Sequence, residues 1–311
     1  MDEEHRLISQ RKQKLQQLRA ADINPYPSTF HKTHYASDLL LRYAKLKNEE
    51  KSKETVSLAG RIMTLRIMGK AGFAHLQDMT GQIQIYARED ELGTRAYQFF
   101  TKYDLGDIIG VEGYVFRTKI GELSLWVKKN SLLAKSICPL PEKWHGLKDT
   151  ELRYRERYVD LLVHPEVKET FLQRGKIIQA MREFLVSRDF IEVETPILQP
   201  LYGGTNARPF KSFLHNLKMD VYMRISNELY LKRLLVGGYE KIFEFSPDFR
   251  NEGIDSTHNP EFLQMETMWA YANYTDNMLF VEEMIMFIAK KIGKMTLTYG
   301  DHLIDFGKKW K

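Results

Sequence analysis

Two short segments of this chain, joined by a polar loop, combine residue types that could hold a nucleotide beside a cation. They are residues 249–253 (FRNEG) and 258–262 (HNPEF), and Glu266 follows them. Ahead of the loop, aromatic and acidic side chains alternate, which predicts a strand with one core face and one face turned into a groove. After it, Phe262 and Glu266 share a parity with Met268, about 13 Å apart along a strand. That separation would fit an adenine ring at one end and an ammonium at the other.

Arg250 is the natural ligand for a phosphate, because its planar guanidinium can donate to two oxygens at once. Glu252 could accept from an adenine amino group, and Phe262 could stack on the ring. His258 and Asn259 lie on the loop, where they could reach the outer phosphates of ATP. Such a site would neutralise charge and align reactants, without a protein nucleophile. The sequence has no GxxxxGK[ST] loop, so ATP binding would depend on these residues.

The cationic end of this site would require carboxylates, since a desolvated ammonium must be paired. Glu228 and Glu266 are the candidates, and Gly204 could let the backbone approach the ligand. Each feature also has an ordinary interpretation. These are a surface ion pair within the FRNEG segment, a solvent-facing strand residue at position 266, and a plain turn at residues 203–204.

The elements that must position these residues follow two different patterns. Residues 55–136 show short alternating runs typical of strands, at Val56–Leu65, Phe73–Asp78, Gln82–Tyr86, Ile108–Arg117 and Leu123–Val127, with a helical segment at Asp90–Tyr103. Five strands and one helix favour an OB-fold, a small barrel whose open face often binds oligonucleotides. Barrels bind many ligands, so the fold alone is only weak support for nucleic acid.

The rest of the chain mixes helices and strands. Helices are predicted at residues 165–189, Glu228–Val236 and Thr275–Ile292, with a strand at Ile191–Thr195 that Pro196 should end. The fold class is therefore all-β plus α+β in two domains, a barrel followed by an antiparallel-sheet domain. The regions are a helical extension (1–54, with a helix at 4–21), the OB-fold (55–136), a linker (137–160, helical over 153–158) and the α+β part (161–311). The 4–21 helix could present a solvated face. The 153–158 run could be a solvated helix with internal salt bridges, or it could contact a partner subunit or RNA.

Composition narrows the class of protein. The 311 residues include 46 Lys and Arg against 41 Asp and Glu, an excess that permits a polyanionic partner without proving one. One cysteine, Cys138, excludes an intramolecular disulfide or a cysteine-based metal cluster. The first 19 residues are charged and no window approaches 18 apolar residues, so we expect neither a signal peptide nor a membrane span, and a cytoplasmic location.

Several segments, in order, resemble the class II aminoacyl-tRNA synthetases, and the lysyl enzyme of the OB-domain subgroup in particular. FRNEG with HNPEF resembles motif 2, and Phe190–Pro196 is similar to motif 1, which in the family builds the dimer interface. Further matching stretches are Tyr202–Gly204, Ala207–Phe210 and Glu228–Arg233 in the catalytic part, and Gly60–Met63 and Arg66–Lys70 in the anticodon-binding part.

The resemblance implies a lysine–tRNA ligase, which forms lysyl-adenylate from lysine and ATP and transfers lysine to tRNA(Lys). It also implies Mg²⁺ and a homodimer with Pro196 at the interface. In the family an aromatic side chain stacks on an anticodon base and polar strand residues read base edges. The matching positions are Arg66, Phe73, Gln84 and Glu122. The alternative for Phe73 is that it fills the barrel.

The sequence departs from the family pattern at two places. Met268 stands where a tyrosine is usual, and losing a substrate hydrogen bond typically costs about 0.5–1.5 kcal/mol. The chain also ends at Asp305–Lys311, before the glycine-rich motif 3, its arginine and the carboxylates that hold magnesium, so no metal ligand is expected within it. Either the chain is a fragment, or it is a truncated product that cannot catalyse unaided.

Three alternatives to the ligase stay open. One is a non-catalytic tRNA-binding protein, which would bind tRNA without ATP turnover. Another is a paralogue that modifies a protein lysine, although such proteins usually lack the OB domain. The third is an aspartyl or asparaginyl enzyme, against which the HNPEF segment and the pair Glu228 and Glu266 favour a cationic substrate.

Overall fold

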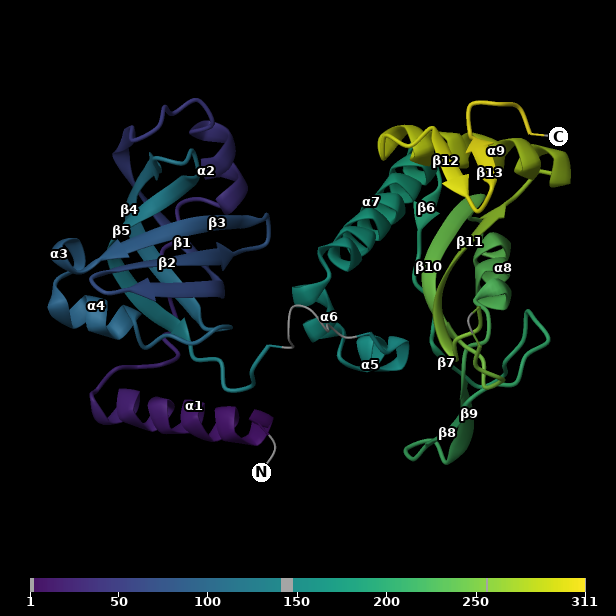
Figure 1. Ribbon diagram of the computed structural model, residues 1–311. Helices are drawn as coiled ribbons and strands as arrows, with labels where there is room; N and C mark the ends of the chain where they lie inside the picture. The colour runs from purple at the N-terminus through teal and green to yellow at the C-terminus, as the bar shows by residue number, and fades with distance from the viewer. Residues whose placement is uncertain (1–2, 141–147, 256, 311) are drawn as a thin grey trace. The chain divides into compact units, whose positions relative to one another are not determined.

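The computed structural model describes residues 3–140, 148–255 and 257–310. The chain forms two compact units, Met1–Val163 and His164–Lys311 (Figure 1). The first is built around a barrel and the second around antiparallel strands with helices, so the predicted fold class is confirmed. None of the helices in the described part combines the length and apolar character that a bilayer crossing requires.

A closed barrel forms the core of the first unit, with strand order β1-β2-β3-β5-β4. Its strands are β1 (Lys51–Met68), β2 (Ala71–Gln77), β3 (Gln82–Arg88), β4 (Ile108–Arg117) and β5 (Leu123–Ala134). β1 is longer than predicted because it pairs with β4 through its first half and with β2 through its second, which closes the barrel. The single helix expected after β3 is two, α3 (Glu89–Leu92) and α4 (Thr94–Phe100), because Gly93 between them has φ +79°.

Alternation along each strand separates the barrel interior from its outer face. In β2, for example, Gly72, Ala74 and Leu76 are buried while the residues between them are partly exposed. Where β4 and β5 pair, only glycine fits at position 113, because a Cβ there would lie 1.8 Å from the carbonyl oxygen of Trp126. The outer face of β2, β3 and β5 is thereby left with polar and aromatic side chains.

The other helices of the first unit are α1 (Glu3–Ala20), α2 (Ala36–Arg42), α5 (Thr150–Arg155) and α6 (Arg157–Val163). Most of α1 is exposed, as one interpretation of its sequence predicted, but it is anchored. Arg11 is only 7% exposed and donates to the carbonyl oxygens of Ser136 (3.3 Å) and Cys138 (3.1 Å). The run predicted as one helix over 153–158 is interrupted at Glu156, which lies between α5 and α6.

The second unit carries two three-stranded sheets and a hairpin. Its elements are α7 (Pro165–Ser187), β6 (Ile191–Glu192), β7 (Leu198–Gln199), β8 (Lys211–Leu214), β9 (Met219–Met223), α8 (Glu228–Val236), β10 (Lys241–Phe249), β11 (Glu261–Trp269), α9 (Tyr274–Lys291), β12 (Thr296–Tyr299) and β13 (His302–Asp305). β10 and β11 run side by side as a long curved antiparallel pair (Figure 1). Helices α7 and α9 pack against them through Phe184, Phe243 and Phe280.

The strand expected over Ile191–Thr195 is much shorter than predicted. Only Ile191–Glu192 forms β6, which pairs in parallel with β10. Beyond it, the N–H of Thr195 donates to the side chain of Glu244 (3.1 Å) instead of to a neighbouring strand. A buried carboxylate thus competes with the backbone ladder for this segment.

Candidate active site and nucleic-acid interface

The β10–β11 pair positions most of the predicted site in the second unit. Its antiparallel register sets Glu244 opposite Glu266 and Asp248 opposite Phe262. The even-numbered side chains of both strands therefore share one face of the sheet, as their parity predicted. This face carries the acidic end and the aromatic end of the candidate site.

The polar side of β10 is not an open groove, and the prediction that Glu244 and Asp248 point into one is wrong. Both are buried, at 3% and 0% exposed, around Arg224, which is 2% exposed. Arg224 Nη1 donates to Glu244 Oε1 at 2.7 Å, and its Nε lies 3.3 Å from Asp248 Oδ1. Asn227 and Thr195 also donate to Glu244. Sequence reasoning missed Arg224, because its partners lie on other elements.

Glu266 lies in an electrostatic environment suited to a cation. One carboxylate oxygen accepts from Ser226 Oγ (3.3 Å) and from the Gln264 amide, while Oε2 is buried without a hydrogen-bond partner in the described part of the chain. Burial, together with the negative charges of Asp248 and Glu228, raises the pKa of Glu266 above its usual range. A positive charge brought to Glu266 would satisfy the free oxygen and offset the repulsion.

Ser226 links Gly204 and Glu228 to this carboxylate, because it donates to Glu266 and lies close to both of them. Gly204 has φ +94°, and a Cβ there would be 2.9 Å from Ser226 Oγ and 3.0 Å from Glu228 Cβ. Glu228 begins α8 and pairs with Lys232 one turn later. The structure therefore brings together three of the four residues predicted for the cationic end. The fourth, Met268, is half-buried on the same parity of β11 as Glu266.

Arg250 and Phe262 meet at the other end of the strand pair. The Arg250 guanidinium carbon lies 5.0 Å from the centre of the Phe262 ring, and its Nε donates to the carbonyl oxygen of Ile225 at 3.4 Å. The proposed surface ion pair with Glu252 is not among the contacts of the described residues. Glu252 instead accepts from the backbone N–H of Arg208 (3.2 Å).

The loop between the strands keeps its predicted phosphate ligands exposed. His258 and Asn259 are both on the surface, and His258 Nδ1 lies 2.9 Å from Asp255. Hydrogen bonds from the Thr257 backbone and from His258 hold the pKa of Asp255 well below its usual range. Asp255 thus stays ionised and fixes the loop, but the described contacts do not bring His258 or Asn259 to Arg250.

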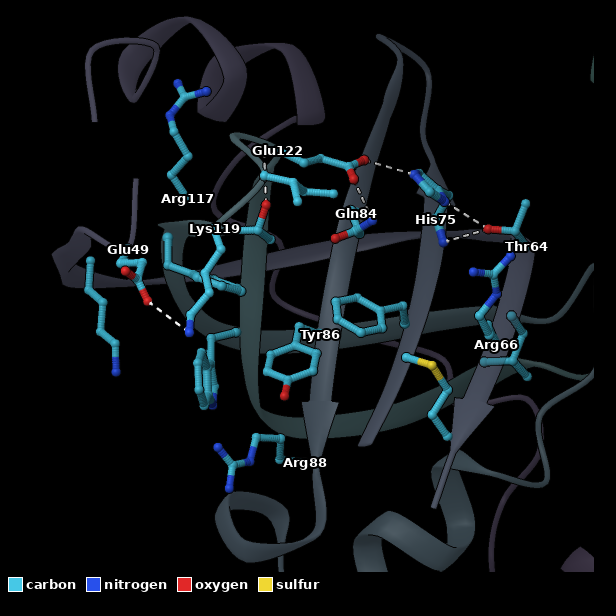
Figure 2. Close-up of a pocket in the computed structure, with 18 residues that line it drawn as sticks. Glu49, Thr64, Arg66, His75, Gln84, Tyr86, Arg88, Arg117, Lys119 and Glu122 are labelled. Atoms are coloured by element: carbon cyan, nitrogen blue, oxygen red, sulfur yellow. Dashed lines mark hydrogen bonds and ion pairs between the residues drawn. The ribbon is translucent and has the colours of Figure 1, made fainter. Parts of the chain in front are cut away.

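The outer face of the barrel forms a groove of about 970 Å³ in the first unit (Figure 2). All four predicted anticodon-binding residues line it, namely Arg66, Phe73, Gln84 and Glu122. Phe73 is partly exposed between the buried residues Gly72 and Ala74, so the alternative that it fills the barrel is wrong.

Comparisons with known proteins agree with this architecture. Residues 149–311 match the family described as tRNA synthetases class II (D, K and N), and residues 56–133 match the OB-fold nucleic acid binding domain. This chain belongs to the class II tRNA synthetases (D, K and N). It is 52% identical over 306 residues to the lysine–tRNA ligase of Carboxydothermus hydrogenoformans, covering 98% of this chain and 62% of that relative.

Other lysine–tRNA ligases show a similar level of likeness. That of Halalkalibacterium halodurans is 51% identical over 98% of this chain and 62% of its own length, and that of Pelotomaculum thermopropionicum is 50% identical over 98% and 59%. This class II tRNA synthetase chain therefore spans about 60% of the length of the curated relatives it matches.

The polar end of the synthetase's groove is a connected set of side chains (Figure 2). Glu122 accepts from Gln84 Nε2 at 2.8 Å and lies 3.2 Å from His75 Nε2, while His75 Nδ1 lies 2.8 Å from Thr64 Oγ1. Sequence reasoning missed Thr64 and His75. The parity of β2 could have found His75, which is two residues from Phe73.

Aromatic side chains form the other end of the groove. Tyr86 stacks on Phe73 with ring centres 4.5 Å apart, and its ring meets Trp126 edge-on at 4.9 Å. Neither Tyr86 nor Trp126 was predicted. Gln84 was predicted from the family resemblance, and Tyr86 shares its parity on β3, so alternation from Gln84 could have identified Tyr86.

Two further predictions for this synthetase concern a metal and a partner subunit. Within the described residues, no group of three or more His, Cys, Asp or Glu side chains has the arrangement of metal ligands. We therefore assign no Mg²⁺ ligand here. Pro196 is exposed, and its carbonyl oxygen accepts from Gln199 Nε2 at 3.1 Å. Its role at a dimer interface stays a prediction.

Proposed function

We propose that this protein is a lysine–tRNA ligase, acting in the cytoplasm as a homodimer with tRNA(Lys), ATP and Mg²⁺. The observation that carries the proposal is Glu266, which lies near the negative charges of Glu228 and Asp248. Its Oε2 is buried without a hydrogen-bond partner, and its carboxylate has no positively charged partner among the described residues. The ammonium of lysine would supply that charge. Met268 would cover the aliphatic stem, and Gly204, which has no Cβ, lets the backbone pass close to Ser226 and Glu228.

The activation step requires charge neutralisation at the other end of the strand pair. A lysine carboxylate oxygen attacks the α-phosphorus of ATP, forming the acyl-phosphate bond while the bond to the bridging oxygen breaks and pyrophosphate leaves. Arg250 would hold the α-phosphate and the carboxylate together, and Phe262 would stack on adenine. Glu252 would accept from the adenine amino group, with His258 and Asn259 reaching the outer phosphates from the loop.

The groove on the barrel would select the tRNA. Lysine codons are AAA and AAG, so the anticodon is UUU or CUU. Single-stranded bases of this kind are recognised by stacking on aromatic rings and by hydrogen bonds to their edges. Phe73 would supply the stacking surface, and Gln84 and Glu122 are held in register by their 2.8 Å hydrogen bond. Arg66, at the rim, would contact a phosphate.

The test is a lysine-dependent ATP–pyrophosphate exchange assay with tRNA binding measured in parallel. We expect Arg250→Ala to abolish exchange, while Glu169→Gln on the exposed surface of α7 leaves it unchanged. A folded protein with no affinity for either lysine or tRNA would contradict the proposal. Tight tRNA binding with no exchange under saturating lysine and ATP would identify the non-catalytic tRNA-binding alternative.

A further inference from the structure

The aromatic half of the barrel groove continues past Phe73. Tyr86 contacts Phe73 on one side and Trp126 on the other, at 4.5 and 4.9 Å between ring centres. Trp126 in turn stacks on Tyr114, at 5.7 Å with an interplanar angle of 19°. A nucleotide chain that passes Phe73 along this face would therefore meet Tyr86 and then the Trp126 ring.

Cations cover this second ring. Lys51 Nζ lies 4.6 Å from the centre of the Trp126 ring and 5.4 Å from that of Tyr114, and the Arg88 guanidinium lies 5.8 Å from Trp126. Arg88 is paired with Asp90, whereas Lys51 has no carboxylate partner among the described residues. An exposed lysine over a tryptophan is held only weakly, because water competes for the charge. A phosphate could therefore draw Lys51 away and uncover the ring.

The indole of Trp126 also has an unused hydrogen-bonding group. Its Nε1 is buried and has no acceptor within the described part of the chain. A buried indole N–H normally finds a partner. The Trp126 ring packs against Tyr86, Tyr114 and Phe116, so it cannot easily move to find one. With no acceptor among the described residues, this N–H would be available to an acceptor that a ligand brings to the edge of the indole.

We propose that Trp126 is a second base-stacking platform, which binds the loop nucleotide next to the base on Phe73 while Lys51 pairs with a phosphate beside it. This inference rests on the proposed function, since it extends the RNA site of the barrel by one nucleotide. The ligand is single-stranded RNA because the surface combines an aromatic face with cations free to meet phosphates. A purely structural Lys51–Trp126 pair would make the opposite prediction, that removing Trp126 affects stability alone.

The decisive experiment combines Trp126→Leu with an abasic scan of the RNA. The full 311-residue chain is titrated with a hairpin RNA carrying the lysine anticodon loop, in which each loop base is removed in turn. Base–aromatic stacking predicts that Trp126→Leu weakens binding of the intact RNA between about fivefold and 150-fold. On the one abasic RNA that lacks the base stacked on Trp126, Trp126→Leu should cause no further loss of affinity. Phe73→Leu should likewise cause no further loss on one abasic RNA, but with a different base missing.

Three more variants test the aromatic face and the phosphate contact separately. Trp126→Phe keeps an aromatic face and should retain most of the affinity, even if Trp126→Leu unfolds the barrel. Lys51→Ala should reduce the slope of log affinity against log salt by about one phosphate contact. Lys53→Ala, an exposed lysine on the same strand, should not.

The outcomes separate a failure of the Trp126 platform from a failure of the proposed ligase function. Equal losses on every abasic RNA, or Trp126→Phe behaving like Trp126→Leu in a folded barrel, would overturn the Trp126 platform. If Phe73→Leu then still weakens binding, the proposed function stands without it. No preference for the lysine anticodon in the wild type, with no effect of Phe73→Leu, would contradict the proposed function as well.

Discussion

Glu266→Gln should change stability and ligand affinity in opposite directions. In the lysine-free protein, burial and the charges of Asp248 and Glu228 raise the pKa of Glu266. The ionised carboxylate is therefore less stable in the folded chain than in the unfolded chain. That cost is present above the folded pKa and disappears as the pH falls through it. Removing the charge should raise the unfolding temperature at pH 7, and the gain should shrink in acid.

The same substitution should weaken lysine binding. A hydrogen bond to a charged group contributes about 1.5–3 kcal/mol, and each 1.4 kcal/mol is tenfold in Kd, so the expected loss is roughly 10- to 150-fold. We expect the lower end of that range, because Glu266 is only partly buried and Glu228 remains nearby. Isothermal titration with lysine, alongside thermal unfolding at pH 5 and pH 7, measures both effects.

The control separates substrate binding from general charge removal. Glu169→Gln, on the exposed surface of α7, removes the same charge away from the site and should alter neither quantity. A Glu266→Gln protein with a lower unfolding temperature and unchanged lysine affinity would refute the reasoning. It would mean that the carboxylate stabilises the strand pair and does not serve a ligand.

Two other substitutions test the frame around the site. Arg224→Met leaves the buried Glu244 without its cation, so it should lower the free energy of unfolding, measured in urea, by about 3–5 kcal/mol. Arg174→Met, on the surface, should leave the free energy of unfolding unchanged. Equal losses in the two variants would argue against the buried network. Gly204→Ala forces a Cβ into a left-handed conformation against a side chain, which should cost about 1–3 kcal/mol and weaken lysine binding. Gly175 lies in an exposed part of helix α7 with open space around it, so Gly175→Ala should instead raise the free energy of unfolding by about 0.5–1 kcal/mol. A similar gain for Gly204→Ala would show that residue 204 is not strained.

The family resemblance, more than strand parity, explains how much of the barrel groove could be predicted. Phe73 and Gln84 were identified because they match positions of the lysyl family, and the structure places both in the groove, on the outer parity of short strands. Trp126 was missed, although it belongs to a predicted strand, because parity alone does not show which outer residues of different strands converge. That convergence depends on barrel closure, in which β3 pairs in parallel with β5 and sets Tyr86 opposite Trp126.

In the second unit, the buried network of Arg224, Glu244 and Asp248 could not be predicted from the sequence. The alternation of β10 is compatible both with a polar groove and with a buried network, and the difference depends on Arg224, which lies outside that strand. Arg224 reaches Glu244 and Asp248 only once β9 and β10 are folded. The same interaction takes the Thr195 N–H out of the β6 ladder through Glu244, which explains why that strand is short.

The register of the strand pair suggests why the carboxylate of Glu244 has a structural role while that of Glu266 can interact with a ligand. Glu244 and Glu266 lie directly opposite each other, and like charges in that relation repel. Arg224, Asn227 and Thr195 neutralise and saturate Glu244. Among the described residues, Glu266 receives only the uncharged donors Ser226 and Gln264, and its Oε2 has no hydrogen-bond partner. The protein thus stabilises one side of the pair with its own arginine and leaves the opposite side short of one positive charge, which a cationic substrate can supply.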